Sequence, residues 1–248
     1  MFSTYFGDRY LARRRQAPPE SGKFWNVTRK GSTAEVAIFD EIGFWGTTAA
    51  DFRNEIRALD VERITLRLNS PGGDVFDGIA IHNLLKQHPA AIDVVVDGIA
   101  ASAASFVAMA GDTVKMSRHS MMMVHEAWGF AMGPAADMRK AADMLERLTN
   151  EIAEMYAERS GTDSAIWLTR MAAETWFSDQ EAVDAGLADE VLGVEAAKNA
   201  FDLSMFRHPP RVDAPPPAAT RAEDALPSEP DWKLAARFAL ATADLEVA

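Results

Sequence analysis

The fold is decided by the segment Ile64–Gly73, which reads ITLRLNSPGG. Apolar and polar residues alternate in its first half, which is typical of a β-strand. Its second half is a sharp turn, because Pro-Gly-Gly bends the chain and leaves backbone N–H groups unshielded by Cβ atoms. Residues 79–85 then have helical spacing, and residues 92–96 form a second strand pattern. The order strand, helix, strand predicts a βαβ unit with parallel strands.

The carboxyl ends of these two strands are expected to meet at one edge of the sheet. Crossovers between parallel strands are right-handed in nearly all proteins, and the loops that follow such strands lie side by side. The turn Asn69–Gly73 should therefore lie beside the small residues Gly98–Ser102, which form the loop after the second strand. A plain strand-to-helix turn could carry the same string. Its position in the sheet is what points to a functional site.

Strand and helix patterns alternate over residues 34–194, which predicts one α/β domain. The other strand patterns cover residues 34–39, 113–116, 121–124 and 187–194, and the other helical patterns cover residues 47–59, 102–110, 134–159, 164–173 and 179–185. The long helix begins at Pro134, a residue suited to a first helical turn, and exceeds what one small domain requires. A chain of 248 residues allows one such domain with appendages.

The two ends of the chain differ from this domain in composition. Residues 1–33 are polar and mixed for most of their length, which predicts an N-terminal arm. Residues 195–248 are predicted to be a tail, because prolines are concentrated between residues 209 and 230. Within this Pro-rich C-terminal tail, residues 231–245 have the spacing of a short amphipathic helix that could dock on a partner.

Composition argues against several classes of chemistry and partner. The chain has no cysteine, and therefore no thiol nucleophile, disulfide or cysteine-held metal. Its formal net charge of −12 argues against binding to duplex nucleic acid, which requires a basic surface. No apolar run is long enough to span a membrane, and residues 1–20 lack the apolar stretch of a secretory signal. We expect a cytoplasmic protein without a cofactor, whose nucleophile, if catalysis is covalent, is a hydroxyl group.

Ser102 is the candidate nucleophile, because it lies at the predicted start of the helix 102–110. Unpaired N–H groups and the positive end of the helix dipole stabilise an anion at such a position. In acyl transfer, the N–H groups of Ala103 and, across the gap between the loops, of Gly73 could hold the oxyanion. The same small residues would also allow close helix packing with no catalytic role. Ser105, one turn deeper, is expected to be structural.

A serine nucleophile needs a base and a carboxylate. His125 is the best placed of the five histidines, since it ends the strand 121–124 at a sheet edge; a packed structural histidine would fit there too. Glu174 is the candidate acid, because the nearby Trp176 and Phe177 would partly desolvate it; an ordinary surface glutamate is the alternative. The other carboxylates that could take this role are Asp179, Asp184, Asp189 and Glu126.

These residues resemble those of the proteolytic subunit of the Clp protease and, more closely, of the ClpP-like serine proteases that tailed phages and prophages encode for head maturation. The strings that carry the resemblance are Asn69–Gly73, Gly98–Ser102, Met123–His125, Glu174–Ser178, Glu181–Val183 and Gly186–Asp189, in the family's order. The resemblance covers residues 34–194 and implies a ClpP/crotonase fold of repeated ββα units with a protruding handle helix. It implies that Ser102 is the nucleophile, that His125 is the general base, and that Gly73 and Ala103 form the oxyanion hole.

The resemblance also implies a function and an assembly. The expected activity is that of a serine endopeptidase, a hydrolase, that cleaves scaffold or major capsid precursor proteins within an assembling phage head in the host cytoplasm. The handle helix implies a homo-oligomer, with a ring as the expected form. A catalytically impaired scaffold protein that keeps the fold and a crotonase-like acyl-CoA enzyme are the alternatives.

Three departures from the family pattern bear on these expectations. Glu174 stands where the family has its catalytic aspartate, so the acid is one methylene longer or comes from elsewhere. The segment between Ser102 and His125 is shorter than in the cellular enzyme. No docking arrangement for a Clp ATPase is recognisable, so such an ATPase is not an expected partner.

Overall fold

The computed structural model describes residues 25–43, 46–193 and 206–208. All of these residues fall within one compact unit, Met1–Pro210. Most of the expected N-terminal arm and most of the Pro-rich tail, including the expected helix 231–245, lie outside the described residues. The limits of the arm, the domain and the tail remain predictions.

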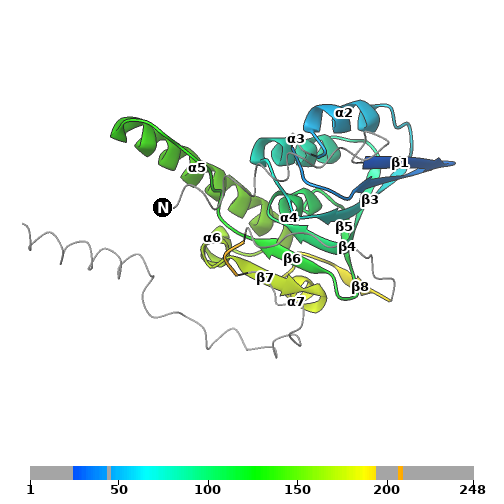
Figure 1. The fold of residues 1–248 in the computed structure, drawn as a ribbon. Coiled ribbons are helices and arrows are strands. Elements are labelled where there is room, and N and C mark those ends of the chain that lie inside the picture. Colours follow the sequence, from blue (N-terminus) through cyan, green and yellow to red (C-terminus); the bar gives the residue numbers. More distant parts are fainter. Residues whose placement is uncertain (1–24, 44–45, 194–205, 209–248) are drawn as a thin grey trace, which may run out of the picture. The chain divides into compact units, whose positions relative to one another are not determined.

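The described part of the chain is built on an eight-stranded mixed sheet (Figure 1). The strands are β1 (Trp25–Lys30), β2 (Thr33–Ile38), β3 (Arg63–Ser70), β4 (Ala91–Ala101), β5 (Thr113–Ser117), β6 (Met121–Val124), β7 (Thr175–Ser178) and β8 (Glu190–Leu192). Their order along the sheet is β1-β2-β3-β4-β5-β8, and β6 pairs with both β4 and β7. The pairs β1·β2 and β6·β7 are antiparallel, and the other pairs are parallel.

Six helices of the described residues connect and cover these strands. They are α2 (Ala49–Arg57), α3 (Val75–Lys86), α4 (Ala103–Ala108), α5 (Ala135–Ser160), α6 (Ser164–Ala172) and α7 (Asp179–Asp184). Side chains that cap backbone N–H groups define where several of these helices begin. Thr48 and Asp74 each accept a hydrogen bond from a first-turn N–H group, and Ser178 forms a reciprocal capping box with Glu181. No described helix combines the length and the apolar character that crossing a bilayer requires.

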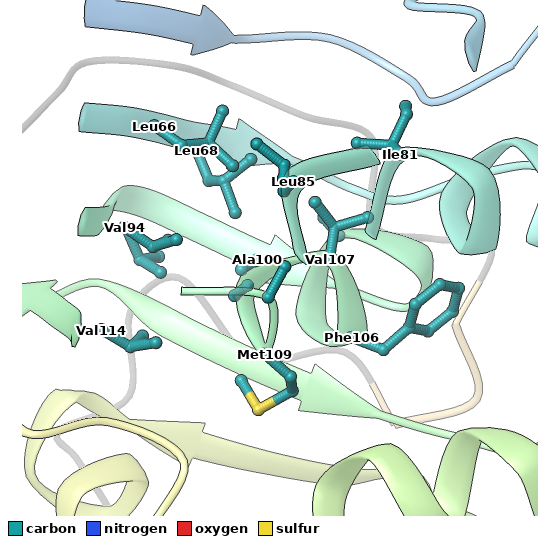
Figure 2. Close-up of a cluster of buried hydrophobic side chains, with 14 of the residues drawn as sticks. Leu66, Leu68, Ile81, Leu85, Val94, Ala100, Phe106, Val107, Met109 and Val114 are labelled. Atoms are coloured by element: carbon teal, nitrogen blue, oxygen red, sulfur yellow. The ribbon is translucent and has the colours of Figure 1, made fainter. Parts of the chain in front are cut away.

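The expected βαβ unit is formed by β3, α3 and β4, whose strands are parallel. Its apolar side chains point inward and meet those of α4, as Figure 2 shows for Leu66, Ile81, Leu85 and Val107, which are all fully buried. Burying a side chain of this size typically contributes about 1.5–3 kcal/mol. The core therefore fixes the position of both strands, and with it the position of the residues at their carboxyl ends.

The structure corrects four expectations about secondary structure. The sheet begins before residue 34, because Trp25–Lys30 pairs antiparallel with β2. The segment Gly98–Ala101 is not a loop: β4 continues to Ala101, because its second half finds a new partner in β6. Thr175–Ser178 forms a strand that the sequence pattern does not predict, while the described part of the expected strand 187–194 is a strand only over Glu190–Leu192.

The long helix α5 confirms the prediction for residues 134–159 closely. Pro134 is its N-cap, and Gly161 ends it in the left-handed conformation. Its second half packs on the core through residues such as Ile152 and Tyr156, whereas its first half is largely exposed and extends beyond the sheet (Figure 1). The excess length is therefore not used by the core of this chain.

Candidate active site

Ser102 lies at the point where β4 ends and α4 begins. The parallel register pairs Ala101 with Met123 of β6, and the Ser102 N–H donates a 3.0 Å hydrogen bond to the Met123 carbonyl. The backbone of Ser102 has φ 53° and ψ −124°, a conformation that side-chain-bearing residues rarely adopt. Such strain is kept only where the surrounding structure holds it, and it often marks a functional residue.

The side chain of His125 reaches Ser102. His125 follows the last residue of β6, so the same register that fixes Ser102 also fixes the histidine. The distance from His125 Nε2 to Ser102 Oγ is 2.8 Å, which is a hydrogen bond. In the tautomer that general-base catalysis requires, the serine hydroxyl donates to an unprotonated Nε2 and the imidazole proton is on Nδ1. The structure thus brings together the two residues that the sequence singled out as nucleophile and base.

The surroundings of His125 favour the form of the ring that can accept a proton. Burial lowers the pKa of His125, the negative charge of Glu174 acts to raise it, and the positive charge of Arg207 acts to lower it further. The net direction is downward, so the imidazole is neutral at neutral pH. A neutral, partly buried imidazole beside a serine hydroxyl is the starting state for general-base catalysis.

The turn Pro71–Gly73 lies directly against the start of α4. A Cβ atom placed on Gly72 would come within 2.7 Å of both Ala103 N and Ser102 Cβ, and within 2.4 Å of the Ala101 carbonyl oxygen. No real side chain tolerates such distances, and Gly72 also has φ +90°. The glycine at 72, which the sequence analysis did not single out by itself, is therefore required for the two segments to touch.

The two expected oxyanion donors are both available. The bridge between Ile42 and Gly73 uses the Gly72 carbonyl and the Asp74 N–H, so the N–H of Gly73 points to the opposite side. Ala103 is the first residue of α4, where N–H groups have no acceptor within the helix. Among the residues that the structure describes, neither N–H group has a hydrogen-bond acceptor.

Asn69 and Ser70 shape this turn, a role that the sequence analysis did not assign to them. The β3–β4 register shifts between Leu68 and Ser70, and the buried Asn69 replaces a ladder bond by accepting from the Ile99 N–H at 3.1 Å. The Ser70 hydroxyl accepts from the Gly72 N–H at 3.1 Å. Side chains that bond to nearby backbone in this way stabilise turns. In the sequence, the only indication that Asn69 and Ser70 stabilise the turn is their position directly before Pro-Gly-Gly.

Glu174 does not bond to His125. Its backbone is in the left-handed region, at φ 50°, and its carboxylate accepts hydrogen bonds from two backbone N–H groups, those of Arg207 at 2.7 Å and His208. It is still close enough to His125 to influence the pKa of the ring. The sequence indicates that this carboxylate lies near His125, but it does not indicate which groups donate hydrogen bonds to it.

The other candidate acids are engaged elsewhere. Asp179 accepts from the His119 N–H, Asp184 from the Gln180 side chain, and Asp189 from the Val114 N–H and from Arg159. No hydrogen bond joins any of them, or Glu126, to His125 within the described ranges. In the same ranges no cluster of three potential metal ligands occurs.

Ser105 has the structural role expected of it. Its hydroxyl donates to the Ser102 carbonyl at 2.6 Å and accepts from the hydroxyl of Tyr156, which is 2.7 Å away in α5. The turn that carries Ser102 is thus bonded to the long helix through one buried hydroxyl.

A serine and a neutral histidine are hydrogen-bonded at the carboxyl edge of a largely parallel sheet, next to two N–H groups that have no acceptor among the described residues, which is the arrangement expected of a serine hydrolase site. Comparison with known proteins agrees with this class. The family model of Clp protease matches residues 34–195, and on that evidence the chain belongs to the Clp protease family. It is accordingly a hydrolase of the serine peptidase type with the α/β fold of that family.

Individual relatives support the assignment. The chain is 36% identical to the ATP-dependent Clp protease proteolytic subunit 1 of Prochlorococcus marinus subsp. pastoris over 147 residues, which cover 58% of this chain and 75% of that protein. It is 33% identical to the ATP-dependent Clp protease proteolytic subunit of Bacteroides fragilis over 167 residues, which cover 62% of this chain and 80% of that protein. A solved structure of a mutant of ClpP1 from Listeria monocytogenes superposes with a TM-score of 0.56 at 25% identity, covering 64% of this chain and 90% of that one.

Proposed function

We propose that this chain is a serine endopeptidase in which Ser102 attacks the carbonyl carbon of a peptide bond. As Ser102 Oγ forms its bond to that carbon, His125 Nε2 takes the hydroxyl proton. The protonated imidazole then gives the proton to the leaving amine, and the peptide bond breaks. Water repeats the sequence on the acyl-enzyme and releases the carboxylic acid. The observation that carries this proposal is the 2.8 Å hydrogen bond from Ser102 to His125.

The oxyanion of the tetrahedral intermediate would be held by the N–H groups of Gly73 and Ala103. Both are free among the described residues, and the close approach of Gly72 to Ala103 puts the two segments side by side. Preorganised donors of this kind typically contribute about 10²–10³ in turnover each. Because both are backbone groups, an ordinary substitution at Gly73 or Ala103 would not delete either donor.

A fluorophosphonate probe tests the mechanism directly. Intact-protein and peptide mass spectrometry should find one phosphonyl group, on Ser102, and Ser102→Ala should abolish both labelling and cleavage of a peptide substrate. Labelling should also be lost in His125→Ala. Ser120→Ala is the matched control, since Ser120 is a buried serine whose hydroxyl has no partner among the described residues. Full peptidase activity in Ser102→Ala would refute the assignment.

The proposed substrates are scaffold or major capsid precursor proteins of a phage head, processed in the host cytoplasm or within the procapsid. The sequence strings that resemble the phage proteases support this substrate class. The curated relatives, by contrast, are described as subunits of an ATP-dependent protease. Co-expression with a capsid precursor in the absence of any ATPase separates the two cases. Cleavage that requires Ser102 supports the phage role, whereas cleavage only after a Clp ATPase and ATP are added contradicts it.

The proposed assembly is a homo-oligomer, with a ring as its form. The exposed first half of α5 carries apolar side chains that the core does not cover, Met138 and Met144 among them. A second copy of the chain is the expected cover, as the resemblance to the family implies. Light scattering after size-exclusion chromatography should show an oligomer that Met138→Lys and Met144→Lys weaken. A monomer at micromolar concentration would contradict this part.

One observation favours a second candidate, a catalytically impaired assembly protein. The carboxylate of Glu174 accepts from the N–H groups of Arg207 and His208, so no carboxylate of the described residues is hydrogen-bonded to His125. The probe experiment separates the candidates, because an impaired protein would form the same particle without labelling at Ser102.

A further inference from the structure

A short segment, Phe206–His208, lies against the candidate active site although it is more than 80 residues beyond His125 in sequence. It is the short orange segment in Figure 1. The ring of Phe206 meets the His125 ring edge-on, with centroids 6.0 Å apart, and the Trp176 ring at 5.6 Å. Because the segment contacts the proposed base itself, it can influence the position of that base and so the reaction.

Phe206 fills an apolar cup on the face of the sheet opposite the main core. The cup is formed by Ile99, Ala101, Met123 and Trp176, from β4, β6 and β7, and these residues with Phe206 make up a cluster separate from the main core. Phe206 is 7% exposed, so the ring is almost wholly inserted. A buried aromatic ring that fills an apolar pocket is a common anchor of a bound peptide.

The two residues after the anchor hold the carboxylate that the mechanism would use. Arg207 N–H donates to one oxygen of Glu174 and His208 N–H donates to the other. Hydrogen bonds to an ionised acceptor are stronger than those between neutral groups. A carboxylate bonded in this way to two N–H groups has its oxygens directed at the segment, and no hydrogen bond joins it to the imidazole in the described residues.

We propose that the cup and the Glu174 carboxylate form a binding site for a peptide with an aromatic residue followed by two free N–H groups, and that this chain's own Phe206–His208 occupies it as a latch. While the latch is bound, Glu174 is withheld from His125 and the site is held in a low-activity state. Release of the latch lets Glu174 accept a hydrogen bond from the Nδ1–H group of His125 and so orient the ring. The proposal takes Ser102 and His125 as the reacting pair, as proposed above.

Two variants of the full chain test the latch. Phe206→Ala empties the cup, and Arg207→Pro removes one N–H donor to Glu174 while leaving the ring in place. Each should raise the rate of fluorophosphonate labelling at Ser102, measured at about pH 8 where the imidazole is neutral, by roughly 10- to 100-fold, the size expected when a catalytic group is brought into line. Phe39→Ala removes a partly exposed ring that makes no contact in this cluster and should leave the rate unchanged.

The substitution Glu174→Gln distinguishes release of the latch from a general loosening of the structure as the cause of faster labelling. In the Phe206→Ala background this substitution should remove the gain, because the released carboxylate is its source. The tripeptide acetyl-Phe-Arg-His-amide, added to Phe206→Ala, should slow labelling, and acetyl-Ala-Arg-His-amide should not. A gain that survives Glu174→Gln overturns the proposal, and so do folded Phe206→Ala and Arg207→Pro proteins that label no faster than the parent. Absence of labelling at Ser102 in every variant would instead refute the proposed function.

Discussion

The hydroxyl of Tyr156 lies 2.7 Å from Ser105 Oγ and so joins the long helix α5 to the turn that carries Ser102. Burial raises the pKa of Tyr156, although its bond to Ser105 opposes this, so the phenol stays protonated and donates. Ser105 in turn donates to the Ser102 carbonyl. The strained backbone of Ser102 is thus held by a chain of two buried hydroxyl groups.

Tyr156→Phe should lower the free energy of unfolding by about 1 kcal/mol, because Ser105 loses one hydrogen bond but keeps the other. Ser105→Ala should cost more, about 1–3 kcal/mol, since it leaves the Tyr156 hydroxyl buried without its partner. Urea unfolding of both variants measures the difference. Equal, negligible effects would show that these hydroxyls do not hold the turn.

The acid limb of the pH profile should reflect the lowered pKa of His125. Activity needs the neutral imidazole and is lost as the pH falls through its pKa, so the midpoint in kcat/KM should lie below the usual 6.5. Glu174→Gln removes a charge that raises this pKa and should move the midpoint to lower pH. Arg207→Ala removes a charge that lowers it and should move the midpoint to higher pH. Shifts in the same direction would contradict the assignment of these two charges.

Gly72→Ala should abolish labelling of Ser102, because the added Cβ would overlap the Ser102 turn. The matched substitution Gly193→Ala meets no atom within 4 Å and should leave both labelling and stability unchanged. Rates of labelling and thermal unfolding of the two proteins provide the comparison. Normal labelling of a folded Gly72→Ala protein would mean that the two segments do not approach as described.

The ion pair between Arg67 and Asp97 should contribute far more to stability than its neighbour between Arg63 and Asp93. Asp97 is buried at 2% exposure and bonded by two guanidinium nitrogens, so Arg67→Met would leave a buried charge with its main partner removed. We expect a loss of about 3 kcal/mol in the free energy of unfolding. Arg63 is exposed, and Arg63→Met should cost much less. Chemical denaturation that finds equal losses would refute the distinction.

The fold class and the pairing of Ser102 with His125 could be predicted because both depend on where the parallel strands lie and end. The apolar strand patterns at residues 92–96 and 121–124 identify β4 and β6, and parallel topology then brings Ser102 and His125, which follow these strands, to one edge of the sheet. The fold prediction is confirmed by the match to the family. The catalytic roles remain predictions, supported by the distance between the two side chains.

The partners of Glu174 could not be predicted from its surroundings in sequence. The direction of its side chain depends on a left-handed backbone and on N–H groups 33 and 34 residues later. The extension of β4 through Gly98–Ala101 was missed for a related reason. Small residues have weak strand preference, and only pairing with β6 makes them a strand.

The length of β4 has a consequence for how this chain can vary. Its first half pairs with β5 and its second half pairs directly with β6, so Ser102 and His125 are set by one strand and its own ladder. The residues between them, from α4 through β5 to the turn before β6, form an excursion that leaves and rejoins this strand. Insertions or deletions in that excursion need not change the separation of nucleophile and base. The shortening of this segment expected from the resemblance would therefore leave the proposed nucleophile and base in place, and the loops of the excursion are where the chain can change in length without separating them.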